Sequence, residues 1–274
     1  MLEKITYINH MNERIDFGSN GIFIGENELH DFTWTITEKN SRISSFSKGI
    51  VTKAIPVVIS CKTREESIAA RNRLFEVCEK DVLALKHGRI VIGDYYLKCF
   101  VTESKKTTYL KAKTSINIAL VISTDQPYWI KESTYTYNIS SSSSEGSGLD
   151  YNNDFPYDYT TNMIGTLLFN EDFVPSNFRI NIYGACVNPS ISINGHIYSV
   201  NVEIAAKECL TIDSIEKTIV LTHADGTQTN CFNKRDKTSY IFEKIPSGYN
   251  PVASSGDFIY SITLLEERGE PKWI

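Results

Sequence analysis

Short runs of alternating hydrophobic and polar residues recur along most of the chain. Phe32, Trp34 and Ile36 alternate with polar neighbours, and residues 178–184 alternate strictly. A period of two places every second side chain on one face, which is typical of a half-buried strand. The pair Asn194-Gly195 separates two such runs and predicts a tight hairpin turn. The pattern therefore predicts a mainly β protein.

One segment has helical periodicity instead. Thr63 and Glu66 fit a capping box, in which each residue's side chain bonds to the backbone of the other. A helix is predicted over residues 65–80. Residues at spacings of three and four follow the cap, and they predict the stripe that packs on a sheet. That stripe consists of Ile68, Arg71, Phe75 and Cys78, widened by Leu74.

Two polar stretches divide the chain further. Residues 41–48 are polar and serine-rich, which predicts a mobile loop, and residues 140–148 form a Ser/Gly-rich run that indicates a flexible linker. The linker separates a predicted domain of residues 1–139 from a second of residues 149–274. A long surface loop inside one domain is the alternative.

The two predicted domains differ in their elements. The first combines a β-sandwich-like set of strands with the one helix and a β-hairpin at Gly93-Asp94. The second has short strands at a spacing of roughly 8–12 residues with turns between them, which favours a β-sandwich or jelly roll.

The amino-acid composition of the chain excludes some classes of function. The 274 residues carry a net charge of −5, so the chain lacks the basic footprint of a nucleic-acid binder, and we expect no specific nucleic-acid binding. Six cysteines without CxxC spacing predict reduced, mostly buried thiols in a protein folded in a reducing cytoplasm. The N-terminal residues are charged and no apolar run could cross a bilayer, so membrane insertion is not expected.

Motifs for chemistry are missing from the sequence. There is no phosphate-binding loop, GxSxG elbow or HExxH pair, and the five histidines are scattered. We therefore predict no enzyme, no catalytic residue, no cofactor and no metal site. One aromatic block could contact a glycan, with acidic residues between its rings, or could pack as a strand on the domain, and we favour packing. The block contains Tyr151, Phe155, Tyr157 and Tyr159, with Asp150, Asp154 and Asp158 between them.

The order of several weak motifs resembles the distal tail proteins, or Dit, of siphophages. In the first half these motifs are the hairpin at 5–9, the helix with Arg71-Asn72-Arg73-Leu74, residues 93–97 and residues 125–129. The second half is similar to the galectin-like or carbohydrate-module-like sandwich that many Dit proteins carry. The motifs there are residues 175–178, 183–184, 188–191, 194–196 and the tail 266–273.

The resemblance implies a structural tail protein of a phage or prophage. Such a protein forms a ring, typically a hexamer, that joins the tail tube to the tail tip or baseplate. Its expected partners are copies of itself, the tube protein and the tip or baseplate proteins. It would be made in the bacterial cytoplasm and end in the virion tail. The alternative is a glycan-binding module that assists adhesion to the host surface, and a third reading, a cell-wall hydrolase, lacks a catalytic pair.

Overall fold

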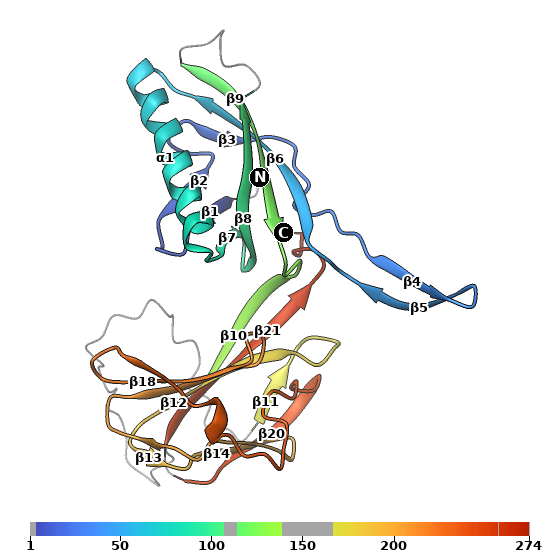
Figure 1. Cartoon of the computed structure of the whole chain (residues 1–274), viewed down its shortest axis with the longest axis vertical. Coiled ribbons are helices and arrows are strands. Elements are labelled where there is room, and N and C mark those ends of the chain that lie inside the picture. Colours follow the sequence, from blue (N-terminus) through green and yellow to red (C-terminus); the bar gives the residue numbers. More distant parts are fainter. Residues whose placement is uncertain (1–3, 107–113, 139–166, 257, 274) are drawn as a thin grey trace. The chain divides into compact units, whose positions relative to one another are not determined.

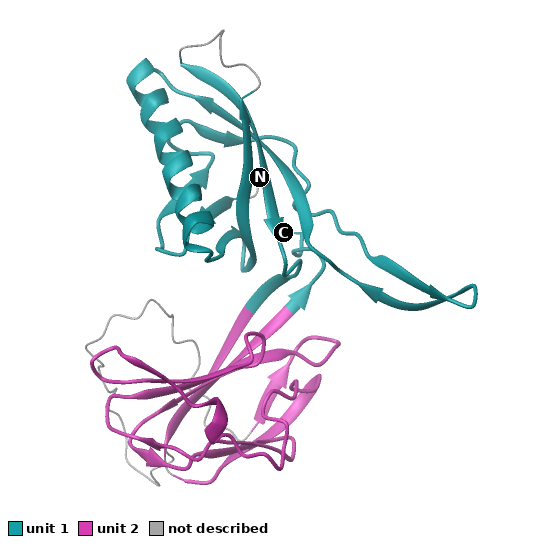
Figure 2. Ribbon diagram, viewed as in Figure 1, with its two compact units in different colours: residues 1–131, 267–274 teal, residues 132–266 magenta. Residues whose placement is uncertain are grey.

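The computed structural model describes residues 4–106, 114–138, 167–256 and 258–273. The protein is mainly β with one α-helix (Figure 1), as the sequence pattern predicts. It divides into two compact units (Figure 2): unit 1 comprises residues 1–131 and 267–274, and unit 2 comprises residues 132–266. The predicted linker at 140–148 lies outside the described residues and stays a prediction. Residues 132–138, predicted in the first domain, are grouped with unit 2, and residues 267–273, predicted in the second domain, are grouped with unit 1.

Unit 1 is built on antiparallel strands that surround a hydrophobic core. Strand β8 is shared by two pairings: its first residues pair with β7 and β10, and its later residues pair with β9. From there the strands continue to β1 and β2 on one side and to β6 and β3 on the other. The strands are β1 (Ile5–Ile8), β2 (Arg14–Phe17), β3 (Ile22–Ile24), β4 (Thr35–Lys39), β5 (Arg42–Ser47), β6 (Val51–Ser60), β7 (Gly88–Ile92), β8 (Tyr95–Lys106), β9 (Ser115–Thr124) and the start of β10 (Trp129–Tyr137).

The predicted helix is α1 (Arg64–Ala84), and its capping box is present. The Glu66 N–H donates to Thr63 Oγ1 at 3.2 Å, and the Thr63 N–H donates to Glu66 Oε2 at 3.3 Å. The predicted buried stripe is wrong in part, because Ile68 and Phe75 are 42% and 56% exposed. The buried face lies about 100° away around the helix axis. It consists of Ser67, Ala70, Leu74, Val77, Cys78 and Asp81.

The segment predicted as a mobile loop, residues 41–48, is instead largely strand β5. It pairs with β4 in a two-stranded hairpin, with a bulge in the register next to Thr37 and Glu38. Asn40 and Ser41 have positive φ values of 53° and 57°, as the central residues of a type I′ turn require.

Unit 2 contains two larger sheets with a shared core, which fits the predicted β-sandwich, and β13 pairs with β16 in a small third sheet. One sheet has the order β19-β18-β17-β12-β21 and the other β11-β20-β14-β15. Phe178 and Ile180 of the first meet Ile191 and Val252 of the second in one buried cluster. The strands are β11 (Leu167–Asn170), β12 (Asn177–Tyr183), β13 (Cys186–Val187), β14 (Ser190–Ile193), β15 (His196–Ser199), β16 (Glu203–Ile204), β17 (Cys209–Asp213), β18 (Thr218–Thr222), β19 (Gln228–Asn230), β20 (Gly248–Ser254) and β21 (Ile259–Arg268).

Candidate assembly surface

The β4–β5 hairpin has two chemically different faces. Ile36 lies opposite Phe46 across the hairpin, and the Trp34 ring meets the Phe46 ring edge-on at 6.3 Å. Glu38 alternates with Ile36 and pairs with Ile43, so Ile43 lies on this same face together with Glu38. The opposite face carries hydroxyl groups, from Thr35, Thr37, Ser45 and Ser47. The hairpin is therefore amphipathic, like a strand pair that covers a core.

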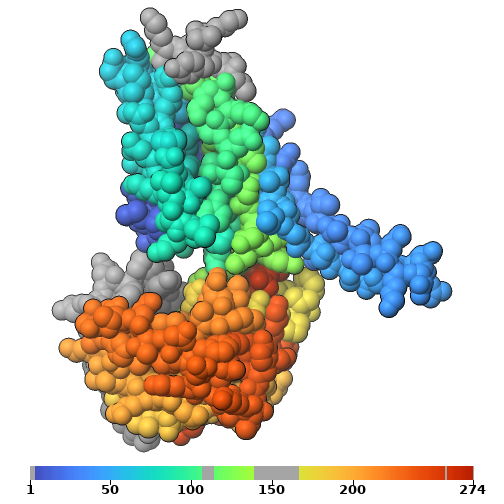
Figure 3. Space-filling model, in the orientation of Figure 1, coloured from blue at the N-terminus to red at the C-terminus, as the bar shows by residue number. Residues whose placement is uncertain are grey.

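No core is covered by this hairpin in the part of the chain that the structure describes. Every residue from 31 to 47 is exposed, and the four apolar side chains are 42–58% exposed. Figures 1 and 3 show the hairpin projecting away from the rest of unit 1. An isolated two-stranded hairpin is marginally stable in water, and a contiguous exposed apolar patch marks an interaction site. The apolar face of the hairpin is thus a candidate surface for binding a partner.

Two lysines fix the base of the hairpin. The Lys48 ammonium lies over the rings of Trp34 and Tyr128, 4.7 and 4.5 Å from their centroids, and it donates to the Pro127 carbonyl at 3.2 Å. Burial lowers the pKa of Lys48, and the nearby charge of Lys53 lowers it further. Lys53 Nζ donates to the Glu28 and Asp31 carbonyls. These contacts set the direction in which the hairpin leaves unit 1.

The second apolar surface is a stripe on the outside of α1. Ile68, Phe75 and Val82 are 42%, 56% and 43% exposed, and each lies seven residues from the next. A spacing of seven residues is close to two helical turns, so the three side chains form one line along the helix. Glu76 and Glu79 are exposed near this outer stripe.

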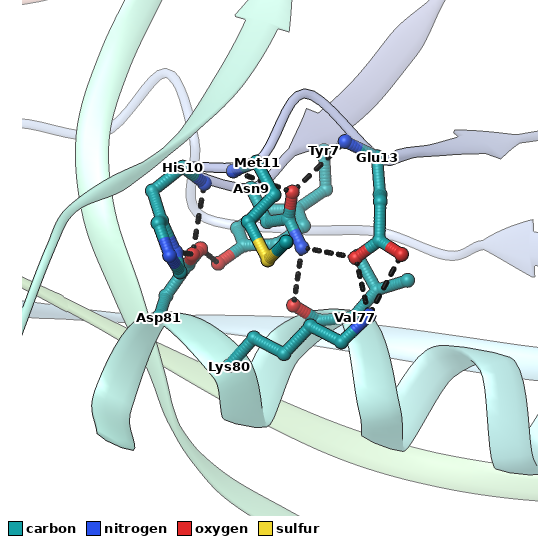
Figure 4. Close-up of polar contacts among 8 residues, drawn as sticks. All are labelled: Tyr7, Asn9, His10, Met11, Glu13, Val77, Lys80 and Asp81. Atoms are coloured by element: carbon teal, nitrogen blue, oxygen red, sulfur yellow. Dashed lines mark hydrogen bonds and ion pairs between the residues drawn. The ribbon is translucent and has the colours of Figure 1, made fainter. Parts of the chain in front are cut away.

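A buried polar network holds α1 against the first hairpin of the chain (Figure 4). The carboxyl group of Asp81 is fully buried, and it accepts a hydrogen bond from Tyr7 Oη at 2.5 Å. It also contacts the His10 backbone N–H at 2.9 Å and His10 Nδ1 at 2.5 Å. Burial and the bond to Asp81 raise the pKa of Tyr7 above its ordinary value. A Cβ on Gly88 would lie 2.2 Å from Asp81 Oδ2, so only glycine fits beside this network.

A second set of contacts in Figure 4 extends this network to the surface. Asn9 Nδ2 donates to the Val77 carbonyl at 3.2 Å and to Glu13 Oε2 at 2.7 Å. Lys80 Nζ contacts both Glu13 carboxylate oxygens, at 2.7 and 2.8 Å. The bonds from Lys80 and Asn9 lower the pKa of Glu13. The helix, and with it the outer stripe, is therefore fixed to β1 and β2 at several points.

The C-terminal tail returns to the segment that precedes the hairpin. The Trp273 ring stacks on the His30 ring, with 3.9 Å between centroids. Beside them is an open hollow of about 660 Å³. Asn27, His30, Asp31, Phe32, Glu270 and Trp273 line it. The tail thus adds to the support of the hairpin base within unit 1.

The structure does not describe the residues that the sequence suggests for glycan contact. Tyr151, Phe155, Tyr157 and Tyr159 lie outside the described residues, so neither the packing nor the glycan reading is tested. Across the described ranges no three His, Cys, Asp or Glu residues are grouped as metal ligands. No helix among them is both long and apolar enough to cross a membrane. All six cysteines are free thiols, and burial raises the pKa of Cys78 to about 12.

Comparisons with known proteins show which solved structures share this fold. No family model and no curated protein sequence matches the chain. Solved structures do match over nearly its whole length. One of them is SPP1 Dit, described as a paradigm of the hub adsorption apparatus of phages that infect Gram-positive bacteria. Its sequence is 8% identical to this chain, and the two structures align with a TM-score of 0.58 over 98% of this chain and 100% of SPP1 Dit. The chain has the fold of a phage distal tail protein.

A second solved structure agrees with this. A chain of the phage P2 baseplate, in its activated conformation with calcium, is 12% identical with a TM-score of 0.63 over 99% of this chain and 100% of its own. The values for the same baseplate with strontium are equal. The resemblance to Dit proteins expected from the sequence is thus confirmed for the fold. The galectin-like character of the second half stays a prediction.

Proposed function

We propose that this protein is a structural component of a phage or prophage tail and works as a hub without enzymatic activity. Copies of it associate into a closed ring that joins the tail tube to the tail tip or baseplate. The observation that carries this proposal is the whole-length likeness in fold to SPP1 Dit, a hub protein by its own description. The likeness extends over both units, so the proposal concerns the whole chain.

The uncovered apolar surfaces of unit 1 support self-association. A ring needs heterologous contacts, in which two different patches on each subunit complement each other. Unit 1 carries two different patches, the hairpin face and the outer stripe of α1. A typical Dit ring has six subunits, and we adopt six copies as the expected number. The tube protein and the tip or baseplate proteins would bind the two flat sides of that ring.

The alternative of a glycan-binding module rests on Tyr151, Phe155, Tyr157 and Tyr159. No observation within the described ranges favours it over the hub. Both readings predict a particle protein in the virion tail, and they differ in whether free sugar binds and in the number of subunits.

The test is the mass of the purified full chain in solution. Six copies of the 31.0 kDa chain have a mass of 6 × 31.0 = 186 kDa. Native mass spectrometry and light scattering should give that closed species, and negative-stain images should show rings. A stable monomer up to concentrations on the order of 100 μM, far above the dissociation constants of stable assemblies, would contradict the hub proposal.

A further inference from the structure

The hollow beside the C-terminal tail is formed by two segments that are far apart in the sequence. Residues 27–32 and residues 270–273 both belong to unit 1 (Figure 2). The hollow has a volume of about 660 Å³, within the range of roughly 300–1,000 Å³ that is usual for small-molecule sites. Its lining combines two aromatic rings, two carboxylates, an imidazole and an amide, from Phe32, Trp273, Asp31, Glu270, His30 and Asn27.

Trp273 offers a free ring face at this hollow. One face of the indole stacks on the His30 imidazole, with 3.9 Å between the ring centroids and 19° between the ring planes. Because this face is covered, the 72% exposure of Trp273 falls mainly on the other face and the ring edge. Phe32, which is 55% exposed, adds a second ring to the lining. The negative face of an aromatic ring attracts weakly positive C–H groups, such as those of a sugar ring.

The two carboxylates of the lining are available to a ligand. Asp31 accepts a hydrogen bond from Lys53 only through its backbone carbonyl. Within the described ranges, no group donates a hydrogen bond to the side chain of Asp31 or of Glu270. An ionised carboxylate accepts strong hydrogen bonds from hydroxyl groups. A saccharide has both surfaces that this lining would recognise, because its hydroxyl donors surround an apolar C–H face.

The charges around the hollow cancel, which favours a neutral ligand. Burial lowers the pKa of Lys53 and the charge of Asp31 opposes this shift, so these two groups lie close together. The Lys48 ammonium lies 3.4 Å from the position that a Cβ would take on Gly269, next to Glu270. Two carboxylates and two ammonium groups give a net charge of 2 − 2 = 0. A cationic ligand would be repelled by the lysines and an anionic ligand by the carboxylates.

The two segments that form the hollow are held in place without a ligand. Leu29 is fully buried and belongs to the core of unit 1. Lys53 Nζ donates to the Glu28 carbonyl at 2.8 Å and to the Asp31 carbonyl, which fixes the first segment. Pro271 of the tail is also buried. A ligand therefore meets a formed hollow and loses little affinity to ordering of the protein.

We propose that this hollow binds a neutral saccharide, with a sugar ring stacked on Trp273 and sugar hydroxyl groups donating to Asp31 and Glu270. The site goes beyond the hub function and does not rest on ring formation. A sugar site in unit 1 is compatible with a hub, so sugar binding by itself does not favour the glycan-binding alternative. That alternative needs sugar to bind at the aromatic block of residues 151–159.

Saccharide titration of the full chain tests the site. The probes are the neutral saccharides cellotriose, maltotriose and tri-N-acetylchitotriose, and binding is followed by tryptophan fluorescence and by saturation-transfer NMR. Of the tryptophans, Trp129 is buried and only Trp273 lines the hollow. We expect saturable binding of at least one probe, with a dissociation constant on the order of 1 mM or lower. The absence of saturable binding for every probe at about 10 mM would overturn the proposal.

Variants of the full chain locate the bound sugar. Trp273→Ala removes the stacking face and should weaken binding by about tenfold, whereas Trp273→Phe keeps a ring and should restore most of the affinity. Glu270→Gln removes one charged acceptor and should weaken binding by about fivefold. The matched control is Tyr249→Ala, because Tyr249 of unit 2 is 73% exposed and Trp273 is 72% exposed. This control should leave the dissociation constant within about twofold of the wild-type value, since it lies outside the hollow.

The outcomes separate this inference from the hub proposal. Circular dichroism and native mass spectrometry check that each variant keeps the wild-type fold and number of subunits. Wild-type affinity in Trp273→Ala, or loss of binding in Tyr249→Ala, would place the sugar elsewhere and overturn the proposed site. A chain that binds sugar through Trp273 but stays monomeric would overturn the hub and leave this site intact. A ring that binds none of the probes would do the reverse.

Discussion

Replacement of Asp81 by alanine should destabilise unit 1 by about 3–5 kcal/mol, because it removes the shared partner of a buried hydrogen-bond network. The Asp81 side chain is fully buried and has three polar contacts, at 2.5, 2.9 and 2.5 Å. A hydrogen bond contributes about 0.5–1.5 kcal/mol net, or about 1.5–3 kcal/mol where one partner is charged, and such contributions within one network do not add in full. The alanine variant would also leave the buried Tyr7 hydroxyl without its acceptor, which adds a desolvation cost of about 1–3 kcal/mol.

A second Asp–His pair in unit 1 provides the control. Asp125 Oδ1 lies 2.8 Å from His87 Nε2, but the Asp125 side chain is 56% exposed. Solvent screens an exposed pair, so the free energy of unfolding of Asp125→Ala should change by at most about 1 kcal/mol. The two variants remove the same chemical group from an Asp–His contact, and they differ in burial and in the number of polar partners that are lost.

Tryptophan fluorescence during urea unfolding measures unit 1 alone. All three tryptophans, Trp34, Trp129 and Trp273, belong to unit 1. With a urea dependence of about 2 kcal/mol/M, the Asp81 variant should unfold at a urea concentration lower by about 2 M. Protein concentration is kept constant, since assembly shifts apparent stability. Equal midpoints for Asp81→Ala and Asp125→Ala would refute the reasoning that burial gives the Asp81 network its energy.

Two further predictions concern unit 1. Lys48→Ala should raise amide hydrogen-exchange rates in residues 35–47 severalfold, because the contacts at the hairpin base are lost, while Lys39→Ala next to the turn should not; equal rates in both would contradict the role given to Lys48. The raised pKa of Tyr7 predicts stability that is fully present below about pH 10 and falls by about 1.4 kcal/mol per pH unit as pH rises from there towards the folded-state pKa. Urea titrations of Tyr7→Phe should show a decline that is shallower by that amount, and an unchanged decline would count against a neutral buried Tyr7.

Features fixed by neighbouring residues were predictable from the sequence. The capping box at Thr63 and Glu66 needs only the spacing of two side chains. The Asn194-Gly195 turn needs two residues that accept positive φ, and these have φ values of 50° and 81°. Neither feature depends on where the rest of the chain lies.

The buried face of α1 was not predictable in this way. Ser67, Leu74 and Asp81 recur at a spacing of seven residues, and so do Ile68, Phe75 and Val82. The second set is the more hydrophobic, so periodicity alone favours it as the core face. The fit of Asp81 beside Tyr7 and Gly88 favours the first set, and this fit depends on contacts between residues far apart in the sequence.

Strand β5 was not predictable from the alternation of polar and apolar residues, because the strand contains a bulge. Ile43 and Phe46 share a face of the hairpin although they are three residues apart, since Ser44 is the extra residue in the register. An alternating pattern with a period of two is therefore broken in the middle of a short, serine-rich segment. The sequence then has the appearance of a loop.

The side chains on the two faces of the hairpin indicate that one face is buried against a partner when the protein is assembled. Neither face contacts the core of unit 1, and the hydroxyl face shows that serine and threonine suffice for a solvated strand. On the other face Trp34 contacts Lys48 at the hairpin base, but Phe46 and the two isoleucines contact no core within the described residues. Burying the exposed halves of four such side chains contributes roughly 3–6 kcal/mol at 1.5–3 kcal/mol for a whole side chain. One such contact is weak, but removing a subunit from a closed ring breaks two of them at once, so contacts of this size can hold a ring together while leaving a single pair of copies only loosely associated.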